Sequence, residues 1–192
     1  MAQRKISYWG LFVLVGMDYY QRIFHRTKKR RHHKGEKHHR HMRTSAGILL
    51  YRKKDNFIEV FLVHPGGPFW KEKEKGAWSI PKGEFTRGED PLTVAKREFE
   101  EETGQTIDGN FVELKPIQQK GGKMVYAWAV EGDADAENIV SNTFKQEWPY
   151  KSGKWITIPE VDKAGWFGVE EAREKMNAAQ FVFIDQLVEI LK

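Results

Sequence analysis

The sequence of 192 residues contains no cysteine, which excludes disulfide bonds, thiolate chemistry and the usual cysteine-ligated zinc sites. Long hydrophobic runs are also lacking, because the apolar stretch at residues 6–17 is shorter than the roughly 20 residues that a membrane-spanning helix needs. Hydrophobic residues make up 40% of the chain and aromatic residues 13%, as is typical of a globular protein. We expect a folded protein, and the absence of cysteine agrees with a cytoplasmic location.

Acidic residues are nearly absent from the first 42 residues. This segment holds 11 of the 32 lysines and arginines but only two acids, Asp18 and Glu36, so its net charge is +9. Residues 43–192 carry a net charge of −4. We therefore expect a basic, disordered extension at residues 1–42, followed by a single domain at residues 43–192.

Several interpretations of the extension stay open. Its charge predicts affinity for nucleic acid or anionic membranes, and its apolar start is compatible with an anchor at a membrane surface. Six of the seven histidines lie in it, which allows adventitious metal binding. A strand-like pattern begins directly after Met42, so the segment also fits a start codon placed too far upstream. Nothing in the sequence indicates an obligate protein partner.

The pattern of apolar residues predicts an α/β sandwich around a mixed sheet for residues 43–192. Two strand pairs flank one helix, two further helices follow, and a polar, acidic segment is expected to be a loop. The predicted strands are residues 45–52, 57–64, 111–119 and 123–131, the helices are 91–103, 170–176 and 181–192, and the loop is 132–154.

Four of the eight residues in REFEEETG (97–104) are glutamates, and a helical wheel divides them between two faces. Asp90 is the expected N-cap of the helix, Pro91 its first residue and Gly104 its end. The glutamates at positions 98, 101 and 102 share one face, whereas Glu100 points to the other side. Converging carboxylates are the ligands that Mg²⁺ or Mn²⁺ prefers, although a solvated acidic face has the same pattern.

The wider stretch GEFTRGEDPLTVAKREFEEETGQ (83–105) resembles the signature of the Nudix hydrolases. That signature is Gly, five residues, Glu, seven residues, then Arg-Glu-apolar-x-Glu-Glu-x-Gly-apolar. The one departure is Gln105, and Ile107 is expected to fill its packing role. The resemblance implies a Nudix-type α/β/α sandwich with a central mixed sheet, and a metal-dependent hydrolase.

The family pattern implies a role for each residue that matches it. Arg97 would orient the glutamates, and Glu89 would tie the preceding loop to the helix. The proton of the attacking water would go to Glu98, Glu131 or Glu147, a choice that the resemblance leaves open. The implied metal ligands are Glu98, Glu101, Glu102 and the backbone carbonyl of Gly83.

The segment WSIPKGEFTRGE (78–89) resembles the version of the motif found in dinucleoside polyphosphate hydrolases and in enzymes acting on diphosphoinositol polyphosphates. The charge of −4 on residues 43–192 disfavours the second class. Phe69 or Trp70 is a candidate for stacking on a purine. The predicted substrate-binding residues are Trp78, Lys82, Lys120, Lys123 and Tyr126.

The resemblance therefore predicts hydrolysis of a phosphoanhydride bond, foremost of diadenosine tetraphosphate to ATP and AMP, with Mg²⁺ or Mn²⁺ as cofactor and a small-molecule nucleotide as partner. Two alternatives stay open. One is a nucleoside triphosphate pyrophosphohydrolase that cleanses the nucleotide pool. The other is a non-catalytic protein that senses nucleotides or binds nucleic acid.

Overall fold

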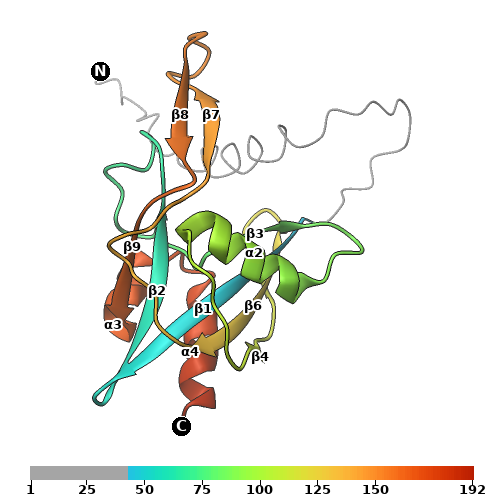
Figure 1. The fold of residues 1–192 in the computed structure, drawn as a ribbon, viewed down its shortest axis with the longest axis vertical. Helices are drawn as coiled ribbons and strands as arrows, with labels where there is room; N and C mark the ends of the chain where they lie inside the picture. The colour runs from blue at the N-terminus through green and yellow to red at the C-terminus, as the bar shows by residue number, and fades with distance from the viewer. Residues whose placement is uncertain (1–42) are drawn as a thin grey trace, which may run out of the picture. The chain divides into compact units, whose positions relative to one another are not determined.

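A computed structural model describes residues 43–192, and the predictions for residues 1–42 lie outside this range. Its centre is a mixed seven-stranded sheet in the order β4-β6-β1-β2-β9, with β3 paired to β1 and β5 paired to β6 (Figure 1). Strands β1 and β6 run parallel, and the other pairs are antiparallel. The strands are β1 (Thr44–Lys54), β2 (Phe57–Pro65), β3 (Lys82–Phe85), β4 (Val112–Glu113), β5 (Ile117–Gln118), β6 (Met124–Glu131) and β9 (Val161–Gly168).

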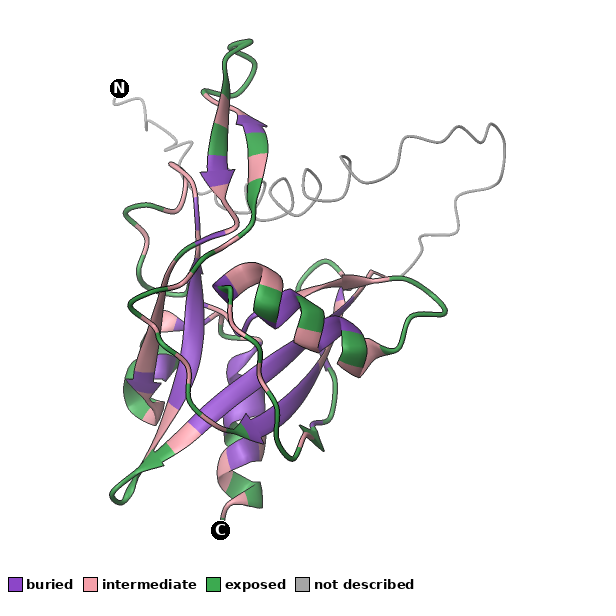
Figure 2. Ribbon diagram, in the orientation of Figure 1, coloured by how far each residue is buried: buried purple, intermediate pink, exposed green. Residues whose placement is uncertain are grey.

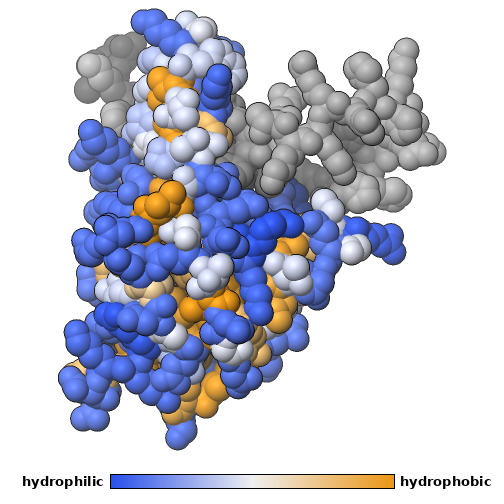
Figure 3. All heavy atoms as spheres, viewed as in Figure 1, coloured by the Kyte–Doolittle hydropathy of each residue, from blue (hydrophilic) through white to orange (hydrophobic). Residues whose placement is uncertain are grey.

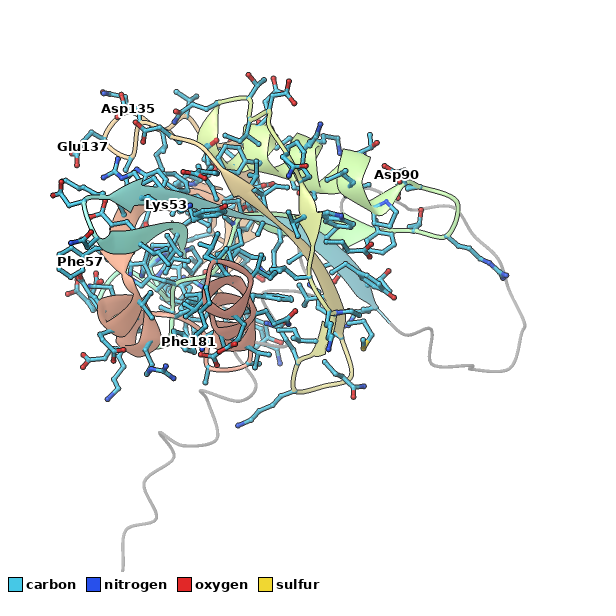
Figure 4. All side chains as sticks on the ribbon, turned by 90° about the horizontal axis from the view of Figure 1, so that it is seen from below. Lys53, Phe57, Asp90, Asp135, Glu137 and Phe181 are labelled. Carbon is cyan, nitrogen blue, oxygen red and sulfur yellow. The ribbon has the colours of Figure 1, made fainter. Side chains whose placement is uncertain are left out.

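Helices cover both faces of this sheet. Helix α2 (Pro91–Thr103) lies on one face, and α3 (Val169–Lys175) and α4 (Phe181–Ile190) lie on the other, as Figure 4 shows with Asp90 and Phe181 on opposite sides. A buried cluster fills each interface, the first around Phe61 and Phe99 and the second around Leu62 and Leu187. The predicted α/β/α sandwich with a mixed sheet is confirmed.

The middle of each central strand carries apolar residues on both faces, as expected where both faces of a sheet are covered. In β1, Ile48 and Leu50 face α2, whereas Leu49 and Tyr51 face α3 and α4. Figure 2 shows the resulting buried centre of the sheet. The predicted β1–β2 hairpin is confirmed, as are the three helices to within two residues at each end. No helix among residues 43–192 is long and apolar enough to cross a membrane.

Two predictions about strands are wrong. The strand expected at residues 111–119 is split into β4 and β5, with Pro116 between them, which has no N–H to donate to a ladder. The loop expected at residues 132–154 contains β7 (Thr143–Glu147), which pairs with β8 (Trp155–Pro159) in a separate hairpin. Four of the five residues of β7 are polar, and only Phe144 is apolar, so the sequence of this strand lacks an alternating apolar pattern.

Candidate active site

Helix α2 begins and ends where its sequence predicts. The carboxylate of Asp90 accepts hydrogen bonds from the backbone N–H of Thr93 at 2.8 Å and from the Thr93 hydroxyl at 2.7 Å. Pro91 occupies the first turn, where no N–H donor is needed. Gly104 ends the helix with φ 73°, in the left-handed region, and donates its N–H to the carbonyl of Glu100 at 2.7 Å. With both ends of α2 defined, the helical period determines which of its side chains face the sheet.

The glutamates of α2 divide between two environments, as the helical wheel predicts. Phe99 is fully buried against the sheet, and its neighbour Glu98 is only 7% exposed. Glu101 and Glu102 are half-buried on the same side as Glu98, whereas Glu100 is exposed. Figure 2 shows this alternation along the helix. The run of charge in the sequence is therefore divided into three carboxylates on the sheet side of the helix and one solvent-exposed residue.

Glu98 lies directly against the backbone of β3. A Cβ atom on Gly83 would stand 1.9 Å from Cδ and from Oε2 of Glu98, so no larger residue fits at position 83 without displacing the carboxylate. Glycine is therefore required here by close approach. The approach brings together two groups predicted to bind one cation, the Glu98 carboxylate and the Gly83 backbone.

Glu102 lies beside the preceding residue of β3. Its Oε2 accepts a hydrogen bond from the backbone N–H of Lys82 at 3.1 Å. Burial raises the pKa of Glu102 to about 8; the Lys82 charge opposes this rise, and the negative charges of Glu98 and Glu160 add to it. Three carboxylates thus lie close enough to repel one another, and a cation among them would relieve the repulsion.

Glu160, between β8 and β9, is a site residue that the sequence did not reveal. Its N–H donates to the carbonyl of Asn142 at 2.8 Å, and its own carbonyl accepts from the N–H of Gly66 at 3.0 Å. Asn142 in turn donates to the carbonyl of Glu101 at 2.9 Å. No motif connects Glu160 to the helix, and the sequence around it, WITIPEVDK (155–163), carries no signal that marks a site residue.

Arg97 contacts the carboxylates from the open side of the helix. Its guanidinium nitrogens lie 3.4 Å from Glu98 Oε1, 3.6 Å from Glu101 Oε1 and 3.5 Å from Glu89 Oε1. The other oxygen of Glu89 accepts hydrogen bonds from the N–H and the hydroxyl of Thr86 at 2.7 and 2.9 Å. Arg97 therefore offsets part of the repulsion and links the helix to the loop before it.

Within residues 43–192, no three histidine or acidic side chains already converge closely enough to hold a metal ion. The Arg97 contacts hold Glu98 and Glu101 on one side, while Glu102 is bonded to β3. The donors themselves suit a divalent cation of the Mg²⁺ type, which prefers carboxylate and carbonyl oxygens. The Glu98 carboxylate lies against Gly83, the residue whose backbone carbonyl is the other predicted ligand.

The predicted phosphate-binding lysines differ in their surroundings. Lys123 is 5% exposed, and its Nζ lies 3.2 Å from Oε1 of Glu84. The pKa of Lys123 is lowered to about 8. Burial is the main cause and the nearby charge of Lys82 adds to it, whereas Glu84 opposes both. Side chains alternate along β3, so Lys82 and Glu84 leave the sheet on the face opposite to Gly83. Lys120 is exposed in the turn before β6.

Tyr126 is half-buried on β6, and its ring meets that of Phe85 edge-on at 5.6 Å, on the face covered by α2. Trp78 lies elsewhere: it is 4% exposed, and its ring packs against Phe167 in the core beneath α4. Its Nε1 donates to Glu74 at 2.9 Å. The structure therefore brings Tyr126, but not Trp78, to the side of the sheet that carries the carboxylates.

Neither of the two other candidate bases lies at the carboxylate cluster, which is formed by Glu98, Glu102 and Glu160. Glu131 is exposed at the end of β6, opposite Tyr51 in the parallel pair, whereas the start of β6 lies opposite Thr44, beside β3. Glu147 lies at the distal end of β7, where its carboxylate accepts a hydrogen bond from the N–H of Gly153 at 2.7 Å.

The loop after β2 begins at the carboxylate cluster. Gly66, at its base, is bonded to the carbonyl of Glu160, as described above. The predicted stacking residues Phe69 and Trp70 are half-buried and meet edge-to-face at 5.0 Å, and the Lys73 ammonium lies 3.1 Å from the Phe69 ring centroid. The loop thus places aromatic side chains on the chain segment that leads away from Glu160.

An acidic helix against a glycine of a short strand, set on an α/β/α sandwich, defines a fold of the Nudix class. The family model of the NUDIX domain matches residues 41–187. The chain belongs to this family.

Comparison with curated proteins finds two relatives. The chain is 40% identical over 74 residues to Nudix hydrolase 7 of Arabidopsis thaliana, a match covering 38% of this chain and 24% of that protein. It is 27% identical over 150 residues to an 8-oxo-(d)GTP phosphatase of Mycolicibacterium smegmatis, covering 72% and 38%. The matches therefore span well under half the length of either relative.

Solved structures share the fold. A binary complex of the Ap4A hydrolase of C. elegans aligns with a TM-score of 0.54 at 21% identity, covering 77% of this chain and 97% of that one. The NUDIX domain of Shewanella oneidensis NrtR in complex with ADP ribose aligns with a TM-score of 0.54 at 14% identity, covering 78% and 88%. At these identities the likeness establishes the fold alone.

Proposed function

We propose that this chain hydrolyses a phosphoanhydride bond in nucleoside polyphosphates, with dinucleoside tetraphosphates as substrates and Mg²⁺ or Mn²⁺ as cofactor. Diadenosine tetraphosphate would give ATP and AMP. The observation that carries the proposal is the proximity of Glu98, Glu102 and Glu160, with Glu98 against the Gly83 backbone, in a chain of the Nudix family.

The residues that would hold the cations are Glu98, Glu101 and Glu102, together with the Gly83 carbonyl. When bound, divalent ions neutralise phosphate charge and lower the pKa of bound water. Arg97 orients Glu98 and Glu101 through its contacts at 3.4 and 3.6 Å. Glu102 resists ionisation in the metal-free fold, so cation binding at this carboxylate would also release a proton near neutral pH.

The attacking water must lose a proton to a carboxylate. Glu98 remains a candidate because it lies in the cluster itself. Glu160 joins it, because its charge acts on Glu102 and its backbone is fixed by hydrogen bonds on both sides. Glu131 and Glu147 lie at the far ends of their strands, and the proposal does not use them.

Two observations support a dinucleoside substrate. The charge of Lys82 acts on Glu102, so a lysine lies within electrostatic range of the carboxylates and of phosphates bound there. The loop bearing Phe69 and Trp70 begins beside Glu160 and offers aromatic rings for a base.

A triphosphate pyrophosphohydrolase is the second candidate, favoured by the likeness to the 8-oxo-(d)GTP phosphatase of M. smegmatis. The non-catalytic alternative is less well supported, because all signature glutamates are retained in this chain.

Rates on a substrate panel with identified products test the proposal. Diadenosine tetraphosphate, ATP, dGTP and 8-oxo-dGTP are compared in the presence of Mg²⁺. Formation of ATP and AMP from the first substrate supports the proposed function. Pyrophosphate and a nucleoside monophosphate as the only products, from a triphosphate, would favour the second candidate. Tight binding of nucleotides without turnover would favour the non-catalytic one.

A further inference from the structure

The β7–β8 hairpin and its turn, residues 143–159, form an arm that stands clear of the seven-stranded sheet (Figure 1). Isolated two-stranded hairpins are marginally stable. Hydrogen bonds nevertheless hold the tip: Trp148 N–H donates to the Lys154 carbonyl at 2.8 Å, and Gly153 N–H donates to the Glu147 carboxylate at 2.7 Å. The arm therefore offers an ordered surface.

Two large aromatic side chains are exposed on the arm, Trp155 at 65% and Tyr150 at 58%. Glu147 pairs with Trp155 across the hairpin and Lys145 with Thr157, so Lys145 lies diagonally from Trp155 on the same face. Figure 3 shows apolar and weakly polar residues among hydrophilic ones on this hairpin, at the top of the view. Exposed aromatic rings that gather on one element indicate a binding surface more strongly than scattered ones.

The arm differs in charge from the rest of the domain. It carries three lysines, at positions 145, 151 and 154, and one acid, Glu147, whose carboxylate is bonded within the tip. Its net charge is +2, against −6 for the remainder of residues 43–192. A basic surface with exposed aromatic rings suits a ligand that combines phosphates with flat bases.

The base of the arm, where β7 begins and β8 ends, lies beside the carboxylates of α2. Before β7, Val140 N–H donates to the Thr103 carbonyl and Asn142 N–H donates to the Glu101 carbonyl, each at 2.9 Å. After β8 comes Glu160, whose charge acts on Glu102. A ligand held at the carboxylates and extending outward can therefore continue along the arm.

We infer that the arm binds the distal nucleoside of a dinucleoside polyphosphate, the one further from the cleaved bond. Trp155 stacks on its base, and Lys145 attracts the phosphate chain. Trp155 is four residues from the root of β8, about 13 Å at about 3.3 Å per residue. A nucleoside monophosphate bound at the carboxylates ends short of this point, whereas the distal nucleoside at the end of a phosphate chain extends toward it. This inference rests on the proposed function and specifies how its substrate is selected.

Kinetics with Trp155→Ala test the inference. We expect the KM for diadenosine tetraphosphate to rise about tenfold, since base–aromatic stacking contributes that much or more. kcat should change little, because the contact is distant from the reacting bond. The inhibition constant of AMP, the product that lacks the distal nucleoside, should stay unchanged. Trp155→Phe should restore most of the affinity, and Lys145→Ala should raise the same KM several-fold.

Phe57→Ala is the matched control, because Phe57 is similarly exposed, at 73%, but is the first residue of β2, next to the β1–β2 turn (Figure 4). Equal losses for the dinucleotide and AMP, or no loss, would overturn the inference while leaving the proposed function intact. So would a change of oligomeric state in Trp155→Ala, which would assign the arm to a second copy of the chain. Loss of single-stranded oligonucleotide binding with an unchanged KM would overturn it as well. Failure of the wild type to cleave the dinucleotide would show that the proposed function itself is wrong.

Discussion

Replacing Glu102 by glutamine tests two effects of this carboxylate: its predicted role in binding a cation, and its effect on the stability of the metal-free protein. The amide keeps the shape of the side chain, and its oxygen can still accept the N–H of Lys82. It removes the charge that a cation would need and that repels Glu98 and Glu160. We therefore expect the variant to lose turnover and to gain stability in the absence of metal.

The size of the stability gain follows from the pKa of Glu102, which is raised from 4.5 to about 8, first by burial and then by neighbouring negative charges. Between these values the folded protein binds the proton more tightly than the unfolded chain does. The stability contributed by protonated Glu102 is fully present below pH 4.5 and is lost as the pH rises through about 8. The whole shift corresponds to roughly 5 kcal/mol, and solvent screening of a half-buried group reduces it to about 1–3 kcal/mol.

Urea denaturation in EDTA at about pH 5 and about pH 8.5 measures this difference. Glu102→Gln should match the wild type near pH 5 and exceed it by about 1–3 kcal/mol near pH 8.5. Adding Mg²⁺ should stabilise the wild type more than the variant, because a ligand stabilises the state that binds it. Turnover should fall at least about a hundredfold.

Glu100→Gln is the control, since Glu100 lies on the exposed face of the same helix. It should leave both turnover and the pH dependence of stability unchanged. A variant at position 102 with the wild-type pH profile would refute the pKa argument. Unchanged turnover would refute the metal assignment.

Four further substitutions have defined outcomes. Gly83→Ala places a Cβ 1.9 Å from a buried carboxylate, so turnover should fall at least about tenfold and the melting temperature should drop, as activity assays and calorimetry will show. Lys123→Met removes the ammonium that lies 3.2 Å from the partly buried Glu84 carboxylate and should cost about 3 kcal/mol of unfolding free energy near pH 7 in urea, a loss that Glu84→Gln in the same chain should partly reverse. Glu131→Gln and Glu147→Gln should each keep turnover within about twofold of the wild type, because neither carboxylate lies at the cluster; a larger loss in either would restore it as a candidate base.

Helix α2 and the faces of its side chains could be predicted because the residues that determine them lie within the helix or at its ends. Asp90, Pro91 and Gly104 define the ends of α2 by side-chain and backbone chemistry alone. The faces of the helix then follow from its period, which separates Glu100 from the other glutamates. These predictions needed no knowledge of distant contacts, and the structure agrees with them.

The remaining site residues depend on contacts between distant segments. Glu160 reaches Glu102 only because β8 and β9 return to the C-terminal half of α2, and no local pattern encodes that return. Trp78 stands next to the signature in sequence, yet its indole packs against Phe167 on the other side of the sheet. Proximity in the chain therefore predicted a ligand contact where the structure has core packing.

The carboxylate cluster works against folding and in favour of binding. Glu98 is nearly buried and Glu102 is held in its acid form near neutral pH, so the metal-free fold carries a cost that ordinary surface glutamates do not impose. Arg97 removes part of this cost without filling the site, because its contacts of 3.4 to 3.6 Å are long and lie at the open side. A cation bound among the carboxylates would remove the remaining repulsion. The same residues therefore lower the stability of the metal-free protein and favour the binding of a positively charged ligand.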